Sequence, residues 1–163
     1  MKVNVVYAHP VADSYLASLH QRVVKTLKAR GDEVIDFDLY AMKFNPTMQP
    51  EEWRGHYEPT QAPKDLQPYI DALLWAEACV FCFPTWWSGM PAILKGYFDR
   101  VFLPGVSFEM VHGKARPSLH NIRKVAAVTS YGGSRFRSWL LGDPPRKLVQ
   151  RLLRSTVKPG APG

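Results

Sequence analysis

Residues 78–102 read A-C-V-F-C-F-P-T-W-W-S-G-M-P-A-I-L-K-G-Y-F-D-R-V-F. The first seven of these residues are almost continuously apolar and rich in strand formers, which is typical of a strand covered on both faces. The last eleven have the apolar spacing of a helix, and Pro91 suits its first turn. A buried strand that leads through a short loop into a helix is the repeating unit of an α/β fold.

The same alternation of strand and helix continues on both sides of this stretch. The further elements that the pattern predicts are strands at 1–8, 33–39 and 125–130 and helices between Ser14 and Gly31, at 66–78 and at 144–156. Residues 41–64 are rich in Pro, Gly and polar residues, and we expect this long excursion to be either functional or disordered. The order of elements predicts one domain, residues 1–163, with a parallel sheet between two layers of helices.

The charge of the chain favours anionic partners. Its 163 residues carry a formal net charge of +7 and a sequence pI of about 9.5. Phosphorylated cofactors or substrates, nucleic acid and membrane surfaces all fit such a charge, and a solvated basic face is the alternative. We expect no nucleic-acid partner, because no block of basic residues or nucleic-acid motif occurs. No apolar run is long enough to span a bilayer, and the chain opens on a strand without a signal peptide, so we expect a cytoplasmic protein.

Two cysteines, Cys79 and Cys82, have the C-x-x-C spacing of some redox and metal sites. Within a strand, however, positions i and i+3 point to opposite faces of the sheet. A metal would also need more ligands than this pair provides. We therefore expect two buried core thiols and no metal site.

Three loops of unusual content leave the carboxyl ends of predicted strands, and they read H-P-V-A-D-S at 9–14, P-T-W-W-S-G-M-P at 84–91 and T-S-Y-G-G-S at 129–134. In open parallel sheets, ligands bind at this edge, where the strand order reverses. The amides that open the helix behind Ser14 suit a phosphate. The alternatives are that Ser14 is an ordinary helix cap and that His9 is a hydrogen-bonded loop histidine.

Trp86 and Trp87 offer flat apolar faces beside the amides of their loop, which suits a planar heteroaromatic ring. The alternative is that one of them is buried beneath residues 41–64. Gly132 and Gly133 let the backbone approach a ligand closely, or form a turn without one. These loops contain no nucleophile–base pair, carboxylate pair or metal-ligand cluster, so we expect a bound cofactor to carry the chemistry.

The stretch from Pro84 to Phe108, which begins P-T-W-W-S-G-M-P-A-I-L-K-G-Y-F-D-R-V-F, resembles that of the flavodoxin-like NAD(P)H:quinone oxidoreductases. V-V-Y-A-H-P-V-A-D-S at 5–14 and T-S-Y-G-G-S at 129–134 resemble two further loops of that family. The resemblance implies a flavodoxin-like fold and a bound flavin, usually FAD and in some bacterial relatives FMN. It also implies two-electron reduction of a quinone with NAD(P)H as co-substrate, and usually a homodimer with the site at the interface.

The resemblance also implies which residues hold the flavin. Its phosphates and ribityl chain would meet His9, Ser14, Tyr15 and Leu16. Its isoalloxazine ring would lie along Pro84, Thr85, Trp86, Trp87 and Ser88, and would be bordered on the other side by Thr129, Ser130, Tyr131, Gly132 and Gly133. Hydride would pass from NAD(P)H to the flavin N5 and then to a quinone in the same place, so no side chain is named as catalytic.

The chain departs from the family in two respects. Leu141 stands about where the better-known animal members have a relay His, so we name no general acid. The family usually continues with a fifth strand and a last helix, and without them the strand at 125–130 would be a sheet edge, which a partner subunit could cover. The alternative functions are an azo- or nitro-aromatic reductase, a flavodoxin-like electron carrier or regulatory flavoprotein subunit, and a shortened non-catalytic member. A carrier would typically be acidic.

Overall fold

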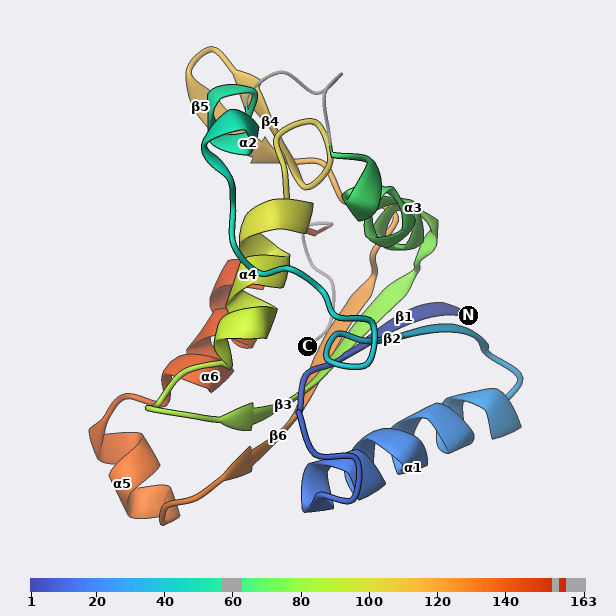
Figure 1. The fold of residues 1–163 in the computed structure, drawn as a ribbon, viewed down its shortest axis with the longest axis vertical. Helices are drawn as coiled ribbons and strands as arrows, with labels where there is room; N and C mark the ends of the chain where they lie inside the picture. The colour runs from blue at the N-terminus through green and yellow to red at the C-terminus, as the bar shows by residue number, and fades with distance from the viewer. Residues whose placement is uncertain (57–62, 154–155, 158–163) are drawn as a thin grey trace.

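The computed structural model describes residues 1–56, 63–153 and 156–157 (Figure 1). Its main sheet has four parallel strands in the order β2-β1-β3-β6. These strands are β1 (Lys2–Tyr7), β2 (Glu33–Asp38), β3 (Ala78–Thr85) and β6 (Lys124–Tyr131). All four were predicted from the sequence, within two residues at each end. The three-layer α/β/α architecture is therefore confirmed.

Helices cover both faces of the sheet (Figure 1). The amphipathic helix α1 (Tyr15–Ala29) packs on the face that presents alternate β1 residues such as Val3 and Val5. Helices α3 (Gln67–Trp75) and α4 (Ala92–Val101) cover the opposite face, where Phe81 and Tyr97 are almost fully buried. Each face thus has its own apolar core, as a parallel sheet requires.

Cys79 and Cys82 confirm the prediction of buried thiols. Cys79 belongs to the core beneath α3 and α4, and Cys82 to the core beneath α1, so the two lie on opposite faces of β3. Burial raises the pKa of each thiol to about 12, and both stay protonated near neutral pH. Such thiols are inert core residues rather than a redox pair.

Several short elements were not predicted. They are α2 (Pro50–Arg54), the 3₁₀ turn η2 (Lys64–Leu66), β4 (Phe108–Val111), β5 (Lys114–Pro117) and α5 (Arg135–Leu140). The strands β4 and β5 form a separate antiparallel hairpin whose turn has positive φ at both His112 and Gly113. Two positive φ values define the type I′ turn that favours hairpins, and V-H-G-K was its overlooked signal.

The basic helix predicted at 144–156 is present over its described residues, but it changes type along its length. The helix α6 (Pro144–Lys147) continues directly into a π-helical turn, η3 (Leu148–Leu153). Val149 and Leu153 turn their side chains into the core under β6, so the segment packs against the sheet. A π-turn shifts side-chain register relative to an α-helix, which apolar spacing alone does not reveal.

The strand β6 is the outer strand of the described sheet. It pairs with β3 over its whole length, and within the described ranges no strand pairs with its other edge. In the same described ranges, no helix is both long and apolar enough to cross a membrane.

The described part of the 41–64 excursion is ordered and runs along α4 (Figure 1). It can lie close because Gly96 has no side chain: a Cβ there would be 2.3 Å from the carbonyl oxygen of Pro46. Beside this contact, the side chain of Arg100 on α4 is buried. Its guanidinium donates to the carboxylate of Glu52 and, at 2.6 Å, to the carbonyl oxygen of Asn45.

Arg100 also donates to Asp65 at 3.1 Å, so one cation joins both ends of the excursion to α4. Burial opposes the positive charge of Arg100, but the hydrogen bonds and charges of Glu52 and Asp65 outweigh it and raise the pKa. The guanidinium stays protonated, and its partners leave no buried charge uncompensated.

We predict that Arg100→Met strongly destabilises the fold. Methionine keeps an apolar stem near Phe44 but leaves Glu52 without its cation, which costs about 3 kcal/mol of unfolding free energy. Urea denaturation followed by circular dichroism measures this loss. Lys95→Met is the matched control, since Lys95 forms an exposed pair with Asp99 on the same helix and should change stability by less than about 1 kcal/mol. Equal effects of the two variants would contradict the role given to Arg100.

Candidate functional site

The three loops singled out in the sequence meet at one edge of the sheet. Parallel pairing places Tyr7 beside Cys82 and Thr85 beside Tyr131, so the carboxyl ends of β1, β3 and β6 lie next to one another. The rings of His9 and Trp86, from different loops, have centroids 6.0 Å apart. The strand order reverses between β1 and β3, which is where open α/β sheets bind ligands.

The first loop delivers the N-terminus of α1 to this edge. Ser14 caps the helix, and its Oγ accepts a hydrogen bond from the amide of Ala17 at 3.1 Å. The Nδ1 atom of His9 accepts from the amide of Val11 at 3.1 Å, which holds the loop in place. Tyr15 is exposed, whereas the side chain of Leu16 is buried in the core, so only its backbone can face a ligand.

The second loop is a tight turn in an uncommon conformation. Trp86 and Gly89 exchange two backbone hydrogen bonds, at 2.9 and 3.0 Å. The two residues between them have positive φ, 50° at Trp87 and 57° at Ser88. Side chains other than glycine avoid this region at a cost of about 1–2 kcal/mol per residue. Such strain is typical of functional sites.

The turn presents its tryptophans to solvent. The side chain of Trp87 is fully exposed and that of Trp86 is 40% exposed. The alternative that one of them is buried beneath the 41–64 excursion is therefore wrong for the described residues. A planar ligand could therefore reach the indole of Trp87 from solvent.

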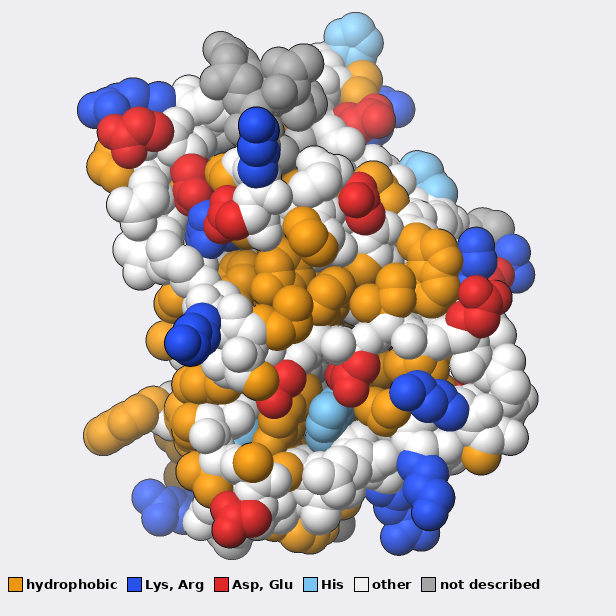
Figure 2. All heavy atoms as spheres, turned by 45° about the vertical axis from the view of Figure 1, so that its right-hand side comes forward, with side chains coloured by type: hydrophobic (Ala, Val, Ile, Leu, Met, Phe, Trp, Pro, Cys, Tyr) orange, Lys and Arg blue, Asp and Glu red, His pale blue; other side chains and the backbone are white. Residues whose placement is uncertain are grey.

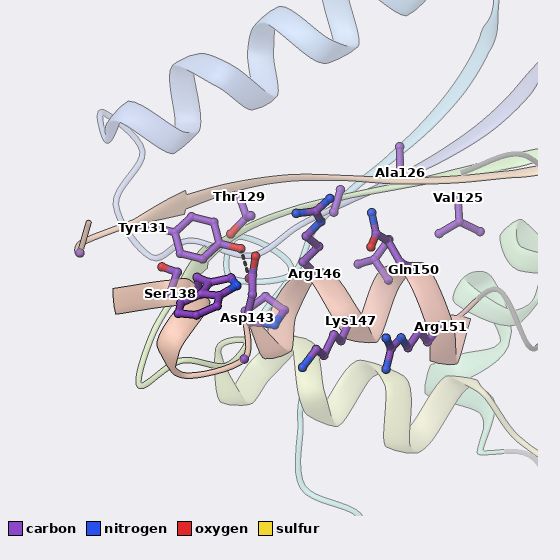
Figure 3. Close-up of a pocket in the computed structure, with 16 residues that line it drawn as sticks. Val125, Ala126, Thr129, Tyr131, Ser138, Asp143, Arg146, Lys147, Gln150 and Arg151 are labelled. Carbon is purple, nitrogen blue, oxygen red and sulfur yellow. Dashed lines mark hydrogen bonds between the residues drawn. The ribbon is translucent and has the colours of Figure 1, made fainter. Parts of the chain in front are cut away.

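The third loop brings a hydroxyl-rich strand end to the same place. The Oγ1 atoms of Thr85 and Thr129 lie 3.0 Å apart, within hydrogen-bonding distance. Tyr131 donates its hydroxyl proton to the carboxylate of Asp143 at 2.6 Å (Figure 3). Burial is the largest cause that raises the pKa of Tyr131, and the hydrogen bond and negative charge of Asp143 also raise it. The resulting pKa is about 12. This phenol therefore keeps its proton across the physiological range.

The remaining predicted residues line the same edge. Pro84 is buried as part of β3, and Ser130 is half-buried in β6. A Cβ on Gly132 or Gly133 would meet nothing within 4 Å, so the backbone there is open to a ligand. Asp143 was missed by the sequence analysis, although G-D-P at 142–144 is a turn signal beside the predicted loop.

A groove continues from this edge along β6. It has a volume of about 1,020 Å³ and separates β6 from α5, α6 and η3 (Figure 3). Thr129, Tyr131 and Gly133 line it and also belong to the predicted site. Trp139, from the unpredicted helix α5, contributes an exposed aromatic ring.

The edge supplies backbone amides, hydroxyls and exposed aromatic rings. Among the described residues, no group of His, Cys, Asp and Glu side chains has metal-binding geometry. A planar ring can stack on an exposed indole, and a phosphate can accept from the amides that open α1. These donors fit a phosphorylated heteroaromatic cofactor such as a flavin nucleotide.

Comparison with known proteins is consistent with this architecture. A family model described as flavodoxin-like fold matches residues 1–156. The chain belongs to the flavodoxin-like family. This membership confirms the fold that the sequence resemblance implied.

Similar proteins include oxidoreductases from bacteria and mammals. The chain is 34% identical over 126 residues to an uncharacterized NAD(P)H oxidoreductase of Haemophilus influenzae, covering 77% of this chain and 62% of the relative. It is 34% identical over 146 residues to rat NAD(P)H dehydrogenase [quinone] 1, covering 80% of this chain and 53% of the relative. The chain thus spans between about half and two thirds of the length of these relatives.

A solved structure extends the likeness. The NAD(P)H:quinone oxidoreductase from Methanothermobacter marburgensis superposes with a TM-score of 0.83 at 26% identity. The match covers 94% of this chain and 78% of that one. The flavodoxin-like arrangement of strands and helices is therefore shared over nearly the whole chain.

We predict that Ser88→Gly stabilises the protein, because glycine adopts the positive φ of this turn without strain. The free energy of unfolding should rise by about 1 kcal/mol. The same change at Ser18, inside α1, is the control and should lower it by roughly 0.5 kcal/mol. Urea titration of both variants decides the matter, and a loss of stability in Ser88→Gly would show that the turn is not strained.

Proposed function

We propose that the protein is a flavin-dependent NAD(P)H:quinone oxidoreductase. The observation that carries the proposal is the fully exposed Trp87, held on a strained turn at the switch point of the sheet. The N-terminal amides of α1 lie at the same edge, so a ring site and a phosphate site occur together. The relatives named as NAD(P)H oxidoreductases support the same reading.

In this proposal the sequence-predicted residues hold the flavin. The 9–16 loop and the start of α1 would bind its phosphate and ribityl groups through backbone amides, with Leu16 contributing only its backbone. Pro84–Ser88 would lie along the ring, and Thr129–Gly133 would border it. FAD is the first choice and FMN the alternative, since both present the same ring and a phosphate.

A bound flavin would supply two-electron hydride transfer, with NAD(P)H and the quinone occupying the same place in turn. The chain's own residues would bind the flavin and orient the substrate beside it. The Trp86–Gly89 turn would limit where a planar substrate can lie, so that a bound substrate is already aligned for hydride transfer. Tyr131 holds a proton on its hydroxyl, directed at Asp143, and therefore presents a neutral phenol at the border of the site.

We also propose a homodimer and a cytoplasmic location. Four large apolar side chains of the α5 region are exposed beside the site: Phe136, Trp139, Leu140 and Leu141. An exposed apolar group of this kind marks a contact surface, which a second copy would cover. The two unpaired cysteines fit a reducing compartment.

The experiment is a flavin reconstitution followed by turnover. We expect the purified protein to be yellow, or to become yellow after addition of FAD or FMN and gel filtration. NAD(P)H should bleach it within a turnover, and a quinone should restore the colour. A protein that stays colourless with both flavins would refute the proposal. Fast reduction only by a separate reductase would indicate an electron carrier, and turnover with azo or nitro compounds but not quinones would indicate the alternative reductase.

We predict that Trp87→Ala weakens flavin binding roughly tenfold, because one stacked aromatic face is worth about 1 kcal/mol or slightly more. Quenching of flavin fluorescence on titration with apoprotein measures the dissociation constant. Trp53→Ala is the matched control, since Trp53 is an exposed tryptophan of α2 in the excursion and should leave the constant unchanged. Equal affinities of Trp87→Ala and wild type would remove Trp87 from the site.

A further inference from the structure

Tyr7 has a buried hydroxyl that the proposed chemistry does not yet use. The residue ends β1 at the carboxyl edge of the sheet, and only 3% of it is exposed. Among the described residues, its oxygen forms no hydrogen bond of ordinary geometry. A buried hydroxyl without a full partner costs free energy, and a phenylalanine would fill the same space without that cost. The hydroxyl is therefore a candidate for a role in the ligand-bound protein.

Contacts with α1 fix the orientation of Tyr7. Its ring is stacked on the ring of His20, with centroids 4.3 Å apart and planes 10° apart. His20 is held in turn by Asp36 on β2, whose carboxylate lies 2.8 Å from its Nε2 atom; an ionised carboxylate only accepts, so Nε2 carries the hydrogen. Tyr7 also belongs to the same buried cluster as Leu16 and Ala17. The phenol therefore lies beneath the first turns of α1 in a fixed orientation.

The hydroxyl of Tyr7 lies close to the side chain of Ser14, which caps α1. Burial is the largest influence and raises the pKa of the phenol, whereas the Ser14 side chain lowers that pKa and the charge of Asp38 raises it. The pKa of Tyr7 stays above its ordinary value, so the phenol keeps its proton near neutral pH and can donate it. Asp38 is engaged elsewhere, since its Oδ1 atom accepts from the amides of Tyr40 and Ala41 at 3.0 Å each.

The hydrogen-bonding capacity of Ser14 shows what such a donation would do. A serine hydroxyl has two acceptor lone pairs and one proton to donate. The Oγ atom of Ser14 uses one lone pair for the amide of Ala17, at 3.1 Å. If Tyr7 donates to the other, the proton of Ser14 has to point away from both, toward the open N-terminus of α1. There the unpaired amides and the helix dipole favour an anion.

We propose that Tyr7 is a positioning residue for the phosphate of the bound flavin. Its hydroxyl donates to Ser14, and Ser14 donates to the phosphate, so that the two hydroxyls form a chain that ends on the anion. The proposal rests on the proposed function, which places that phosphate at the start of α1. Hydrogen bonds in a chain polarise one another, and a bond to a charged acceptor is the stronger kind. Tyr7 itself is too deeply buried to touch the ligand.

The test compares FMN with riboflavin, which has the same ring and ribityl chain but no phosphate. Each is titrated into apoprotein of the wild type and of Tyr7→Phe, and quenching of flavin fluorescence gives the dissociation constants. We expect Tyr7→Phe to bind FMN about fivefold more weakly and riboflavin equally well, because one hydrogen bond of the chain is lost while the ring stays on His20. Its free energy of unfolding without ligand should not fall, because the hydroxyl has no full partner there.

Tyr97→Phe is the matched control. Tyr97 is also a fully buried tyrosine, but it belongs to the core on the opposite face of the sheet, so both dissociation constants should stay as in the wild type. Equal weakening of FMN and riboflavin in Tyr7→Phe would overturn the proposal. A loss of stability with an unchanged ratio of the two affinities would overturn it as well, since it would show a purely structural hydroxyl, such as one bonded to Asp38.

A double variant tests whether Tyr7 acts through Ser14. Ser14→Ala should weaken FMN binding by itself, because it removes the hydroxyl that meets the phosphate. Adding Tyr7→Phe to Ser14→Ala should then cost no further affinity, because the chain is already broken. A further loss of about fivefold in the double variant would show that the two residues act independently and would contradict the proposed chain.

Inorganic phosphate separates this proposal from the proposed function. In isotope-labelled apoprotein it should shift the amide resonances of Tyr15 and Leu16, and Tyr7→Phe should need about fivefold more phosphate for the same shift. A wild type that prefers FMN to riboflavin by a factor that Tyr7→Phe leaves unchanged refutes only the role of Tyr7. A wild type that binds neither flavin but responds to phosphate through Tyr7 refutes the flavoprotein and leaves the positioning role standing. A wild type that binds neither flavin nor phosphate refutes both.

Discussion

The parallel pairing of β1 with β3 and of β3 with β6 is the constraint on which the rest of the structure depends. Parallel strands end at the same edge, so loops that are about 45 to 75 residues apart in the chain become neighbours. The same pairing requires a crossover helix between strands and buries both faces of the sheet. Parallel pairing therefore explains why the strands are apolar on both faces, why amphipathic helices cover them, and why the polar and aromatic loops gather at one edge.

The stability of this frame allows strain at the edge. Two cores, one on each face, and the Arg100 cluster hold the strands and the excursion in place. Against that background the turn at Trp87 and Ser88 keeps two unfavourable backbone conformations. The turn cannot relax easily, because Trp86 and Gly89 are hydrogen-bonded to each other and flank it with β3 and α4. Strain of this kind positions a side chain that solvent alone would leave mobile.

Basic and acidic side chains are distributed differently on different parts of the surface. On the face drawn in Figure 2, Lys and Arg side chains are scattered and interspersed with Asp and Glu around a central apolar area, as on an ordinary solvated surface. The lining of the groove beside β6, by contrast, contains Arg146, Lys147 and Arg151 with a single acidic residue, Asp143. The net charge of +7 therefore says little by itself, and the placement of single cations decides what they can bind.

The sequence by itself determined the strands, the longer helices, the three loops of the edge and the burial of Cys79 and Cys82, because these follow from local apolar periodicity and turn residues. Tertiary structure alone decided the exposure of Trp87, the cluster around Arg100 and the pairing of Tyr131 with Asp143. Those features depend on contacts between residues far apart in the chain, or on a π-turn that shifts register. The apolar pattern of a single segment predicts neither the long-range contacts nor the π-turn, because it contains no information about the segments that pack against it.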